Sequence, residues 1–270
     1  MNSQVALPSS LSQDKPNPAR VYDYLLGGYH NFEHDRQSGE RLIQNCPDLR
    51  TAGHAQRAFL RRAVRFLCEQ GIDQFIDLGS GLPTCGNVHE IAQAIIPTAH
   101  VVYVDIDPVA VAHSQMILQN KTFVTAIQAD VCQPQEILDH AEVRRLIDLQ
   151  RRAAVLCFTI LHYVVQDQLA YHVVGAFASA LAPGSYIAIS HATLDDVPPE
   201  ILKQLERFYT RVATPLKPRT QTEIARFFDG LDLAEPGLVC GVLWRPEGPD
   251  DLFLDEPGRC QMYVGVGRKP

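Results

Sequence analysis

Three aspartates that follow apolar runs are the residues best placed to bind a ligand. Asp77 precedes a turn that contains Gly79 and Gly81, whereas Asp105 and Asp130 each end a later apolar run. Glycines let a backbone pass close to a ligand, and the two oxygens of a carboxylate can accept hydrogen bonds from both hydroxyls of a ribose or from an adenine amino group. Three acids at the ends of successive strands are better explained by a nucleoside-containing ligand than by acids that are merely solvated in loops.

Each of these positions also has a simpler interpretation. The glycine turn is consistent with a tight strand-to-helix connection that holds no ligand, and Asp107, directly before Pro108, suits the N-cap of a following helix. We therefore assign the ribose to Asp105 and the cap to Asp107, and we keep Asp107 among the residues expected at the binding site. Val131 would cover the adenine ring.

The spacing of the glycines separates this turn from a dinucleotide site. A G-x-G-x-x-G fingerprint places a helix N-terminus against a pyrophosphate. Here Gly79-Ser80-Gly81 is followed by Leu82-Pro83-Thr84-Cys85-Gly86, so the third glycine comes late and the turn is longer. The sequence therefore favours a ligand without a pyrophosphate.

These acids and glycines lie in a pattern of alternating strands and helices. After Gly71, five apolar runs alternate with amphipathic segments, which is typical of βαβ units and a parallel sheet. This predicts a doubly wound α/β fold whose ligand site lies at the carboxyl ends of the strands. The predicted strands are 74–78, 100–104, 125–128, 153–158 and 186–190, and the predicted helices between them are 88–96, 108–120, 137–149 and 168–181.

The two ends of the chain differ from this central pattern. Ahead of the sheet, residues 21–28 predict a short helix that ends at a glycine turn, and residues 55–70 predict a longer amphipathic helix. Behind it come the segments predicted as helices, 199–212 and 220–228, and then two β-rich stretches, 238–244 and 261–267. Short returning strands of this kind pair antiparallel at one edge of a sheet.

Composition indicates a globular protein and argues against nucleic-acid binding. The 270 residues carry 24 Lys and Arg against 31 Asp and Glu, a net charge of -7 that lacks the basic surface needed to neutralise phosphates. Seven cysteines without a C-x-x-C pair predict reduced thiols and no metal site. The N-terminus has no signal-peptide pattern, and no run is long enough to span a bilayer. We expect a cytoplasmic protein with a small-molecule partner and no membrane or nucleic-acid partner.

Longer motifs resemble a bacterial family of S-adenosylmethionine-dependent methyltransferases. The resemblance extends from about Pro18 to the segment Trp244-Arg245-Pro246, which is nearly the whole chain. The motifs that carry it are Ala19–Gly28, the pair Asn31-Phe32, the segments Asp77–Thr84 and Asn87–Glu90, and Pro183-Gly184-Ser185.

This resemblance implies a cofactor, a fold and a set of site residues. S-adenosylmethionine would bind with its methionine part at Gly79 and Gly81, its ribose at Asp105 and its adenine at Asp130. The sheet would be Rossmann-like with an antiparallel C-terminal strand pair, and the segment 22–31 would fold over the site as a lid. The domains would be a flexible arm (1–18), an N-terminal helical lid segment (19–70) and a methyltransferase core (71–270). The other residues expected at the cofactor are Tyr22, Asn31, Asp77 and Thr159.

Two histidines are candidates for the chemistry of the acceptor. Methyl transfer must align the acceptor atom and, for an alcohol or phenol, remove its proton. His162 and His191 follow the fourth and fifth predicted strands, and histidine titrates in the useful range. A structural hydrogen-bonding role is the alternative for each. The predicted function is methyl transfer to a small molecule at oxygen or nitrogen, with a non-catalytic cofactor-binding protein and, less favoured, a nicotinamide-dependent oxidoreductase as alternatives.

Overall fold

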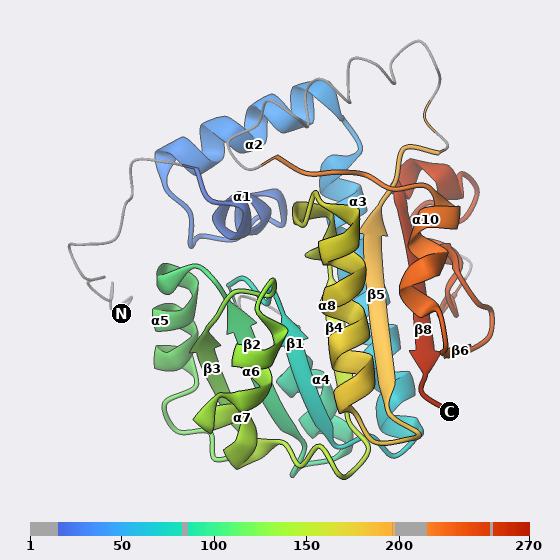
Figure 1. The fold of residues 1–270 in the computed structure, drawn as a ribbon. Helices are drawn as coiled ribbons and strands as arrows, with labels where there is room; N and C mark the ends of the chain where they lie inside the picture. The colour runs from blue at the N-terminus through green and yellow to red at the C-terminus, as the bar shows by residue number, and fades with distance from the viewer. Residues whose placement is uncertain (1–15, 83–85, 196, 198–214, 249–250) are drawn as a thin grey trace.

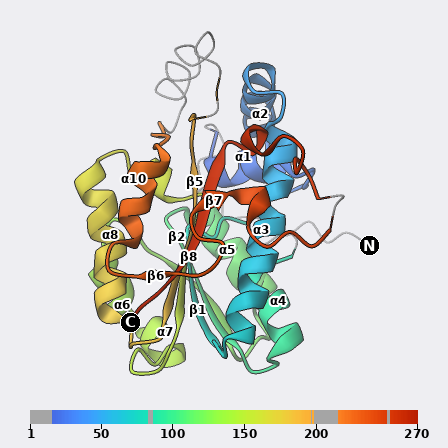
Figure 2. The same ribbon diagram turned by 90° about the vertical axis from the view of Figure 1, so that its right-hand side faces the viewer.

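The computed structural model describes residues 16–82, 86–195, 197, 215–248 and 251–270. Within these ranges the chain folds into three layers, a central sheet with helices on both faces (Figures 1 and 2). Most of the arm predicted at 1–18 and all of the helix predicted at 199–212 lie outside the described residues, as do residues 83–85 of the glycine turn.

The sheet has the strand order β3-β2-β1-β4-β5-β8-β6, with β7 paired to β8. Strands β1 to β5 are parallel, and β8 runs antiparallel to β5, β6 and β7. The predicted doubly wound, mostly parallel sheet with antiparallel C-terminal strands is therefore confirmed. The strands are β1 (Gln74–Leu78), β2 (His100–Asp105), β3 (Val124–Gln128), β4 (Ala154–Phe158), β5 (Tyr186–Ala192), β6 (Asp232–Leu233), β7 (Val239–Cys240) and β8 (Met262–Arg268).

Burial on both faces explains why the strands are continuous apolar runs. In β1, Phe75 contributes to a core beneath the two helices α3 (Leu49–Glu69) and α4 (Val88–Ile95), while the next residue, Ile76, packs on the opposite face. That opposite core lies under α6 (Pro134–Asp139), α7 (Ala141–Leu146) and α8 (Asp167–Ala180). Successive side chains of a strand point to opposite faces, so both must be apolar when helices cover both.

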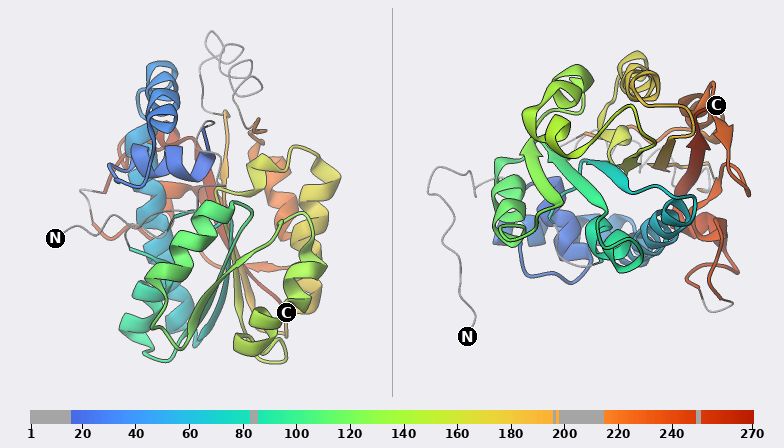
Figure 3. Two further views of the ribbon diagram at one scale, coloured as in Figure 1. Left: turned by 90° about the vertical axis from the view of Figure 1, so that its left-hand side faces the viewer. Right: turned by 90° about the horizontal axis from the view of Figure 1, so that it is seen from below.

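Two further helices cover the carboxyl ends of the parallel strands. In Figure 1, α1 (Pro18–Leu25) and α2 (Glu33–Asn45) lie above the arrowheads of the parallel strands, and the left-hand view of Figure 3 shows both helices in blue at the same upper end of the molecule. Helix α1 begins where Asn17 accepts hydrogen bonds from the backbone of Ala19 and Arg20. This arrangement encloses the edge of the sheet where the predicted site residues gather.

The boundaries of several elements differ from those predicted. The segment predicted as one helix at 137–149 forms α6 and α7 instead, because the chain leaves helical geometry at His140. Helix α3 begins at Leu49 rather than at residue 55, and only two residues of the stretch 238–244 form a strand, β7. The remaining short elements are α5 (Pro108–Ile117), α10 (Gln221–Ala225), and the 3-10 turns η1 (Leu161–Tyr163), η2 (Arg226–Phe228), η3 (Gly241–Leu243) and η4 (Pro257–Cys260).

Candidate functional site

A cavity of about 500 Å³ lies at the carboxyl ends of the parallel strands and is lined on another side by residues of α1 and α2. Its volume falls in the range of small-molecule sites, roughly 300–1,000 Å³. The wall combines the ends of β1, β2, β4 and β5 with residues from α1, α2, α3 and the segment before β8. The predicted site residues that line it are Tyr22, Asp77, Gly79, Gly81, Asp105, Thr159 and His162.

The glycine turn is held against the end of β2. Gly79 and Gly81 adopt positive φ angles of 68° and 62°, a region in which most side chains are strained. A Cβ at Gly79 would lie 2.5 Å from the side chain of Ile160. The Gly81 N–H donates to Oδ2 of Asp105 at 2.8 Å, so the turn and this carboxylate position each other.

Burial raises the pKa values of both acids, Asp77 and Asp105, at this end of the cavity. Desolvation raises the pKa of Asp77 to about 7, with the Arg57 guanidinium opposing the shift and the Asp105 carboxylate adding to it. Desolvation also raises the pKa of Asp105, although backbone donors, among them the N–H groups of Asp107 and Gly81, hold it down. Two mostly buried carboxylates on one wall favour a ligand group that carries positive charge.

Arg57 is a cavity residue that sequence reasoning missed. The spacing of Arg57, Arg61 and Arg65 on α3 predicts a solvated charged face. Arg61 and Arg65 do lie on such a face, where both pair with the partly exposed Glu247. Arg57 instead lines the cavity, where its Nη2 donates to the carbonyl of Gly86 at 2.6 Å. The i,i+4 spacing does not distinguish them, because only the tertiary fold brings the glycine turn to Arg57.

The two predicted catalytic histidines occupy different environments. His162, in η1 after β4, lines the cavity, and its Nδ1 is buried without a hydrogen-bond partner among the described residues. Desolvation, reinforced by His191 and Arg219, lowers the pKa of His162 well below its usual value, so the ring is neutral at neutral pH. A neutral ring keeps a lone pair that can accept a proton.

His191 is fully buried in β5 and does not line the cavity. Its Nε2 lies 2.9 Å from Nη1 of Arg219. Because a guanidinium can only donate hydrogen bonds, Nε2 of His191 is the acceptor. Its Nδ1 lies 2.8 Å from the carbonyl of Ala192 and therefore donates. Burial lowers its pKa to about 3, and both nitrogens of the neutral ring are engaged. The geometry matches the structural alternative for His191 and leaves no lone pair for an acceptor.

Arg219, a second residue that sequence reasoning missed, holds the turn that carries His162. This guanidinium is 1% exposed and donates to the carbonyls of Leu161 and Val164 at 3.1 and 2.8 Å as well as to His191. Leu161 is the first residue of η1, and Val164 directly follows it. Nothing in the segment Lys217-Pro218-Arg219 indicates burial, because an arginine beside proline in a polar stretch is typical of a surface loop.

Thr159 lies on the wall between the two ends of the cavity. Its φ of 53° is unusual for a β-branched residue, and its N–H donates to the backbone oxygen of Ser190 at 3.2 Å and to the hydroxyl oxygen of Ser190 at 3.0 Å. The neighbouring strand β5 therefore helps to fix the strained turn after β4. Such strain persists only where surrounding contacts enforce it, and it is frequent at ligand sites.

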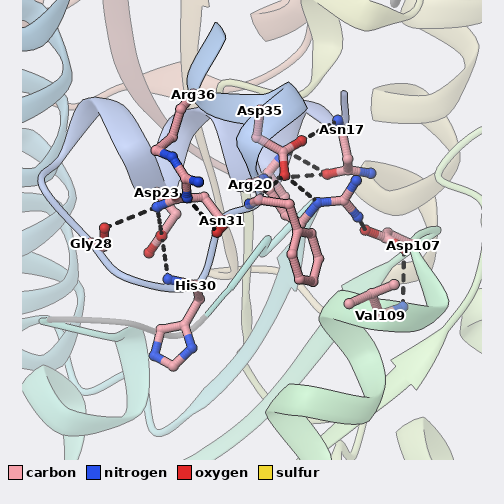
Figure 4. A network of polar contacts seen from close by, with 12 residues as sticks. Asn17, Arg20, Asp23, Gly28, His30, Asn31, Asp35, Arg36, Asp107 and Val109 are labelled. Atoms are coloured by element: carbon pink, nitrogen blue, oxygen red, sulfur yellow. Dashed lines mark hydrogen bonds and ion pairs between the residues drawn. The ribbon is translucent and has the colours of Figure 1, made fainter. Parts of the chain in front are cut away.

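Two of the predicted cofactor residues, Asp107 and Asn31, belong to the network that anchors the N-terminal helices (Figure 4). Asp107 caps α5 by accepting from Val109 N–H at 3.0 Å and faces Nη1 of Arg20 at 3.7 Å. Arg20 in turn pairs with the buried Asp35 at 2.8 Å. The cap predicted for Asp107 is thus confirmed, and the network ties α1 and α2 to the loop that follows β2.

Asn31 is the second of these residues. Its amide donates to the carboxylate of Asp23 and to the carbonyl of Gly28, both at 2.9 Å, and the residue does not line the cavity (Figure 4). Asp130 and Val131, which follow β3, do not line it either, and Asp130 accepts from the backbone of Cys132 at 2.8 Å. Their assignment to the adenine stays a prediction.

Three observations limit the kinds of site present, each within the part of the chain that the structure describes. These residues contain no group of three or more His, Cys, Asp or Glu side chains able to hold a metal ion. They include no helix with the length and hydropathy of a membrane span. Their cysteines form no disulfide.

Among the solved structures that match this chain, two are similar over nearly its whole length. A candidate methyltransferase from Thermobifida fusca YX is 43% identical, with a TM-score of 0.91 over 98% of this chain and 99% of that one. A protein of the DUF574 family from Streptomyces avermitilis MA-4680 is 35% identical, with a TM-score of 0.90 over 96% and 99% of the two chains. Both therefore share the whole architecture, including the helices above the sheet.

More distant matches share the fold alone. Human N-acetylserotonin methyltransferase, solved in complex with its cofactor, is 16% identical, with a TM-score of 0.50 over 94% of this chain and 63% of that one. No protein of curated function matches the chain. The model of the family described as S-adenosyl methyltransferase matches residues 4–270. With that match and two whole-length relatives, the chain belongs to the S-adenosyl methyltransferase family and is an S-adenosylmethionine-dependent enzyme.

Proposed function

We propose that the protein transfers a methyl group from S-adenosylmethionine to an oxygen or nitrogen atom of a small molecule. The observation that carries this proposal is the cavity itself, which extends from the glycine turn and Asp105 to the neutral ring of His162. A continuous wall would let cofactor and acceptor bind side by side, and the cover formed by α1 and α2 supports a small acceptor.

The residues at the β1 and β2 end suit the cofactor. S-adenosylmethionine carries a sulfonium and an ammonium group, which two buried carboxylates favour, and a ribose diol, which a carboxylate accepts bidentately. We assign the ribose to Asp105, the methionine part to Gly79 and Gly81, and its ammonium and carboxylate to Asp77 and Arg57. When bound, the cofactor supplies an electrophilic methyl group.

The other predicted residues take different parts in this proposal. Tyr22 lines the cavity and donates to the carbonyl of Gly53 at 3.2 Å, so it joins α1 to α3 above the cofactor and supports the proposed lid. Asp130 and Val131 are assigned to the adenine on the family resemblance alone. Thr159 would contact the cofactor from the turn after β4.

At the acceptor end we assign proton removal to His162. Its ring lines the cavity, and Arg219 fixes the turn on which it lies. His191 supports this turn from behind through Arg219 and contacts no reacting group. The catalytic role is thereby proposed for one of the two histidines and a positioning role for the other.

The proposal is tested with cofactor carrying a deuterated methyl group. The enzyme is incubated with this cofactor and a bacterial extract that has been separated into small molecules, protein and nucleic acid, and each fraction is analysed by mass spectrometry. We expect label in the small-molecule fraction, lost with Asp105→Ala and retained with Asp229→Ala, which removes an exposed acid away from the cavity. Label confined to protein or nucleic acid, or cofactor binding without any transfer, would contradict it.

A further inference from the structure

The half of the cavity that lies past β1 differs in character from the half that faces the cofactor residues. The strand order places β4, β5 and β8 on the side of β1 opposite to β2. On this side the wall is mostly apolar, and it includes Phe158, Ile160, Leu216, Pro218 and Met262. An acceptor bound here loses contact with water along most of its surface, so its body must itself be apolar.

Charge at this end is already neutralised within the protein. Arg259 and Asp48 both line the cavity, and they form a two-contact ion pair at 2.7 and 2.9 Å. The other charged residues among the described wall residues are Asp23, Arg57, Asp77 and Asp105, which belong to the opposite half or to its cover. Among these described wall residues a charged acceptor would find no free counter-ion for the hydration that it loses, which is costly, whereas a neutral acceptor needs none.

Three of the described wall residues carry a buried polar atom without a hydrogen-bond partner: Asp23, through Oδ1 in the cover of the cofactor half, and Gln56 and His162. Nδ1 of His162 and Oε1 of Gln56 have no hydrogen-bond partner among the described residues, although the two side chains are 6% and 3% exposed. Gln56 lies on α3 one turn before Phe59, whose ring packs on Phe158 at the end of β4. Unsatisfied buried acceptors are rare, and a ligand that donates a hydrogen bond removes the cost.

We propose that the acceptor is a neutral, apolar molecule of the phenol class, whose hydroxyl lies against His162 and Gln56. This inference rests on the proposed function and narrows it to oxygen. An oxygen lone pair of the acceptor forms the new O–C bond, the C–S bond breaks with its electron pair left on sulfur, and the hydroxyl proton passes to His162. A neutral amine attacks through its own lone pair and needs no base beforehand, so a neutral buried imidazole favours the hydroxyl.

Three probes with the same two-ring body test the proposal by calorimetry in the presence of saturating S-adenosylhomocysteine. They are 2-naphthol, 2-methoxynaphthalene, which lacks the donor, and 2-naphthoate, which carries a negative charge. We expect 2-naphthol to bind about 10-fold more tightly than 2-methoxynaphthalene, because the ether leaves the buried acceptors unsatisfied. It should bind about 100-fold more tightly than 2-naphthoate, since the carboxylate would be buried without a counter-ion.

Variants connect this preference to the two side chains. His162→Phe should abolish the preference for 2-naphthol over 2-methoxynaphthalene while S-adenosylhomocysteine still binds, which also shows that the variant folds. Gln56→Met, matched in length, should reduce the preference. His172→Phe makes the same exchange at an exposed position on α8 outside the cavity and should leave the preference unchanged.

The outcomes separate this inference from the proposed function. If S-adenosylhomocysteine binds but none of the three probes does, or if 2-naphthoate or 2-methoxynaphthalene binds as tightly as 2-naphthol, the phenol class is wrong and methyl transfer stands. If His162→Phe keeps the full preference, the assignment to His162 is wrong. If S-adenosylhomocysteine itself fails to bind the wild-type protein, the proposed function fails first.

Discussion

The two ends of the cavity are built by different means. At the β1 and β2 end, a short segment supplies both glycines and Asp77, and Asp105 reaches it across neighbouring parallel strands. At the β4 and β5 end, His162 depends on Arg219, which lies 58 residues after the Leu161 carbonyl to which it donates. A cofactor end made of local motifs can be recognised in a sequence, whereas an acceptor end assembled from distant segments cannot.

The largest effect should come from the acceptor end. Arg219→Met removes a buried guanidinium, leaves the Val164 carbonyl and Nε2 of His191 unpaired and takes one of two donors from the Leu161 carbonyl, which should lower the free energy of unfolding by about 3–5 kcal/mol. Urea denaturation measures this loss. Arg144→Met, which breaks the exposed pair with Asp139, is the control and should cost at most about 1 kcal/mol. Similar losses for both variants would mean that Arg219 does not support η1.

Next in size is an effect confined to the cofactor end. Asp105→Ala should weaken S-adenosylmethionine binding about 100-fold, since the ribose loses its acceptor and the Gly81 N–H loses the carboxylate that holds the turn. Titration calorimetry gives the dissociation constants. His162→Phe, at the other end, should keep the cofactor affinity within about 2-fold, a change of less than 1 kcal/mol. An equal loss of cofactor affinity in Asp105→Ala and His162→Phe would contradict the assignment of the cofactor to one end of the cavity.

The two ends should also respond oppositely to pH in the cofactor-free protein. His162 and His191 have lowered pKa values, so unfolding takes up protons and stability falls as pH drops below about 6.5. Asp77 has a raised pKa of about 7, so its contribution to stability is lost as pH rises from about 4 to about 7.

These opposing signs give a measurable slope. Between pH 5 and 6.5 the free energy of unfolding rises with pH because of the histidines, and Asp77 reduces this slope by about as much as one histidine adds. Asp77→Asn should therefore make the slope steeper by about 1 kcal/mol per pH unit. Chemical denaturation across this range, compared with Asp229→Asn at an exposed position, tests it. An unchanged slope would show that Asp77 is ionised throughout.

The smallest effect should appear where the two ends meet. Thr159→Gly relieves the positive φ of a β-branched residue, which should raise the free energy of unfolding by at most about 1 kcal/mol. Thermal denaturation measures the gain, and turnover should fall because the turn before His162 becomes less fixed. Ser179→Gly, in the exposed last turn of α8, should instead destabilise the protein. A loss of stability in Thr159→Gly would show that the strain is offset by side-chain contacts.

The accuracy of the sequence predictions follows the same division. The strands and the wall positions of Asp77, Asp105 and the two glycines were predictable, because apolar runs buried on both faces and a strand-turn motif are local signals. Helix α2 was not predicted, since Asp35 and Gly39 are its only buried residues and give no apolar stripe. A sequence without such a stripe is typical of a loop.

The surroundings of side chains whose partners are distant in the sequence could not be predicted from local patterns. Arg57 and Arg61 are identical residues four positions apart on one helix, and only the glycine turn brought beside Arg57 separates their surroundings. His162 and His191 were both predicted to follow a buried strand, but β5 continues to Ala192 and therefore contains His191, whose Nε2 accepts from Arg219. In each pair the sequence signal is equal and the tertiary neighbour differs.

The ion pair between Arg259 and Asp48 can form only late in the synthesis of the chain. The two residues lie 211 positions apart, so Asp48 leaves the ribosome long before its partner is made. At about 5–20 residues per second, this wait lasts roughly 10–40 seconds. During that time Asp48 has no Arg259 to pair with, and this wall of the cavity, which also needs Leu216 and Met262, is completed only when the last part of the chain has been made.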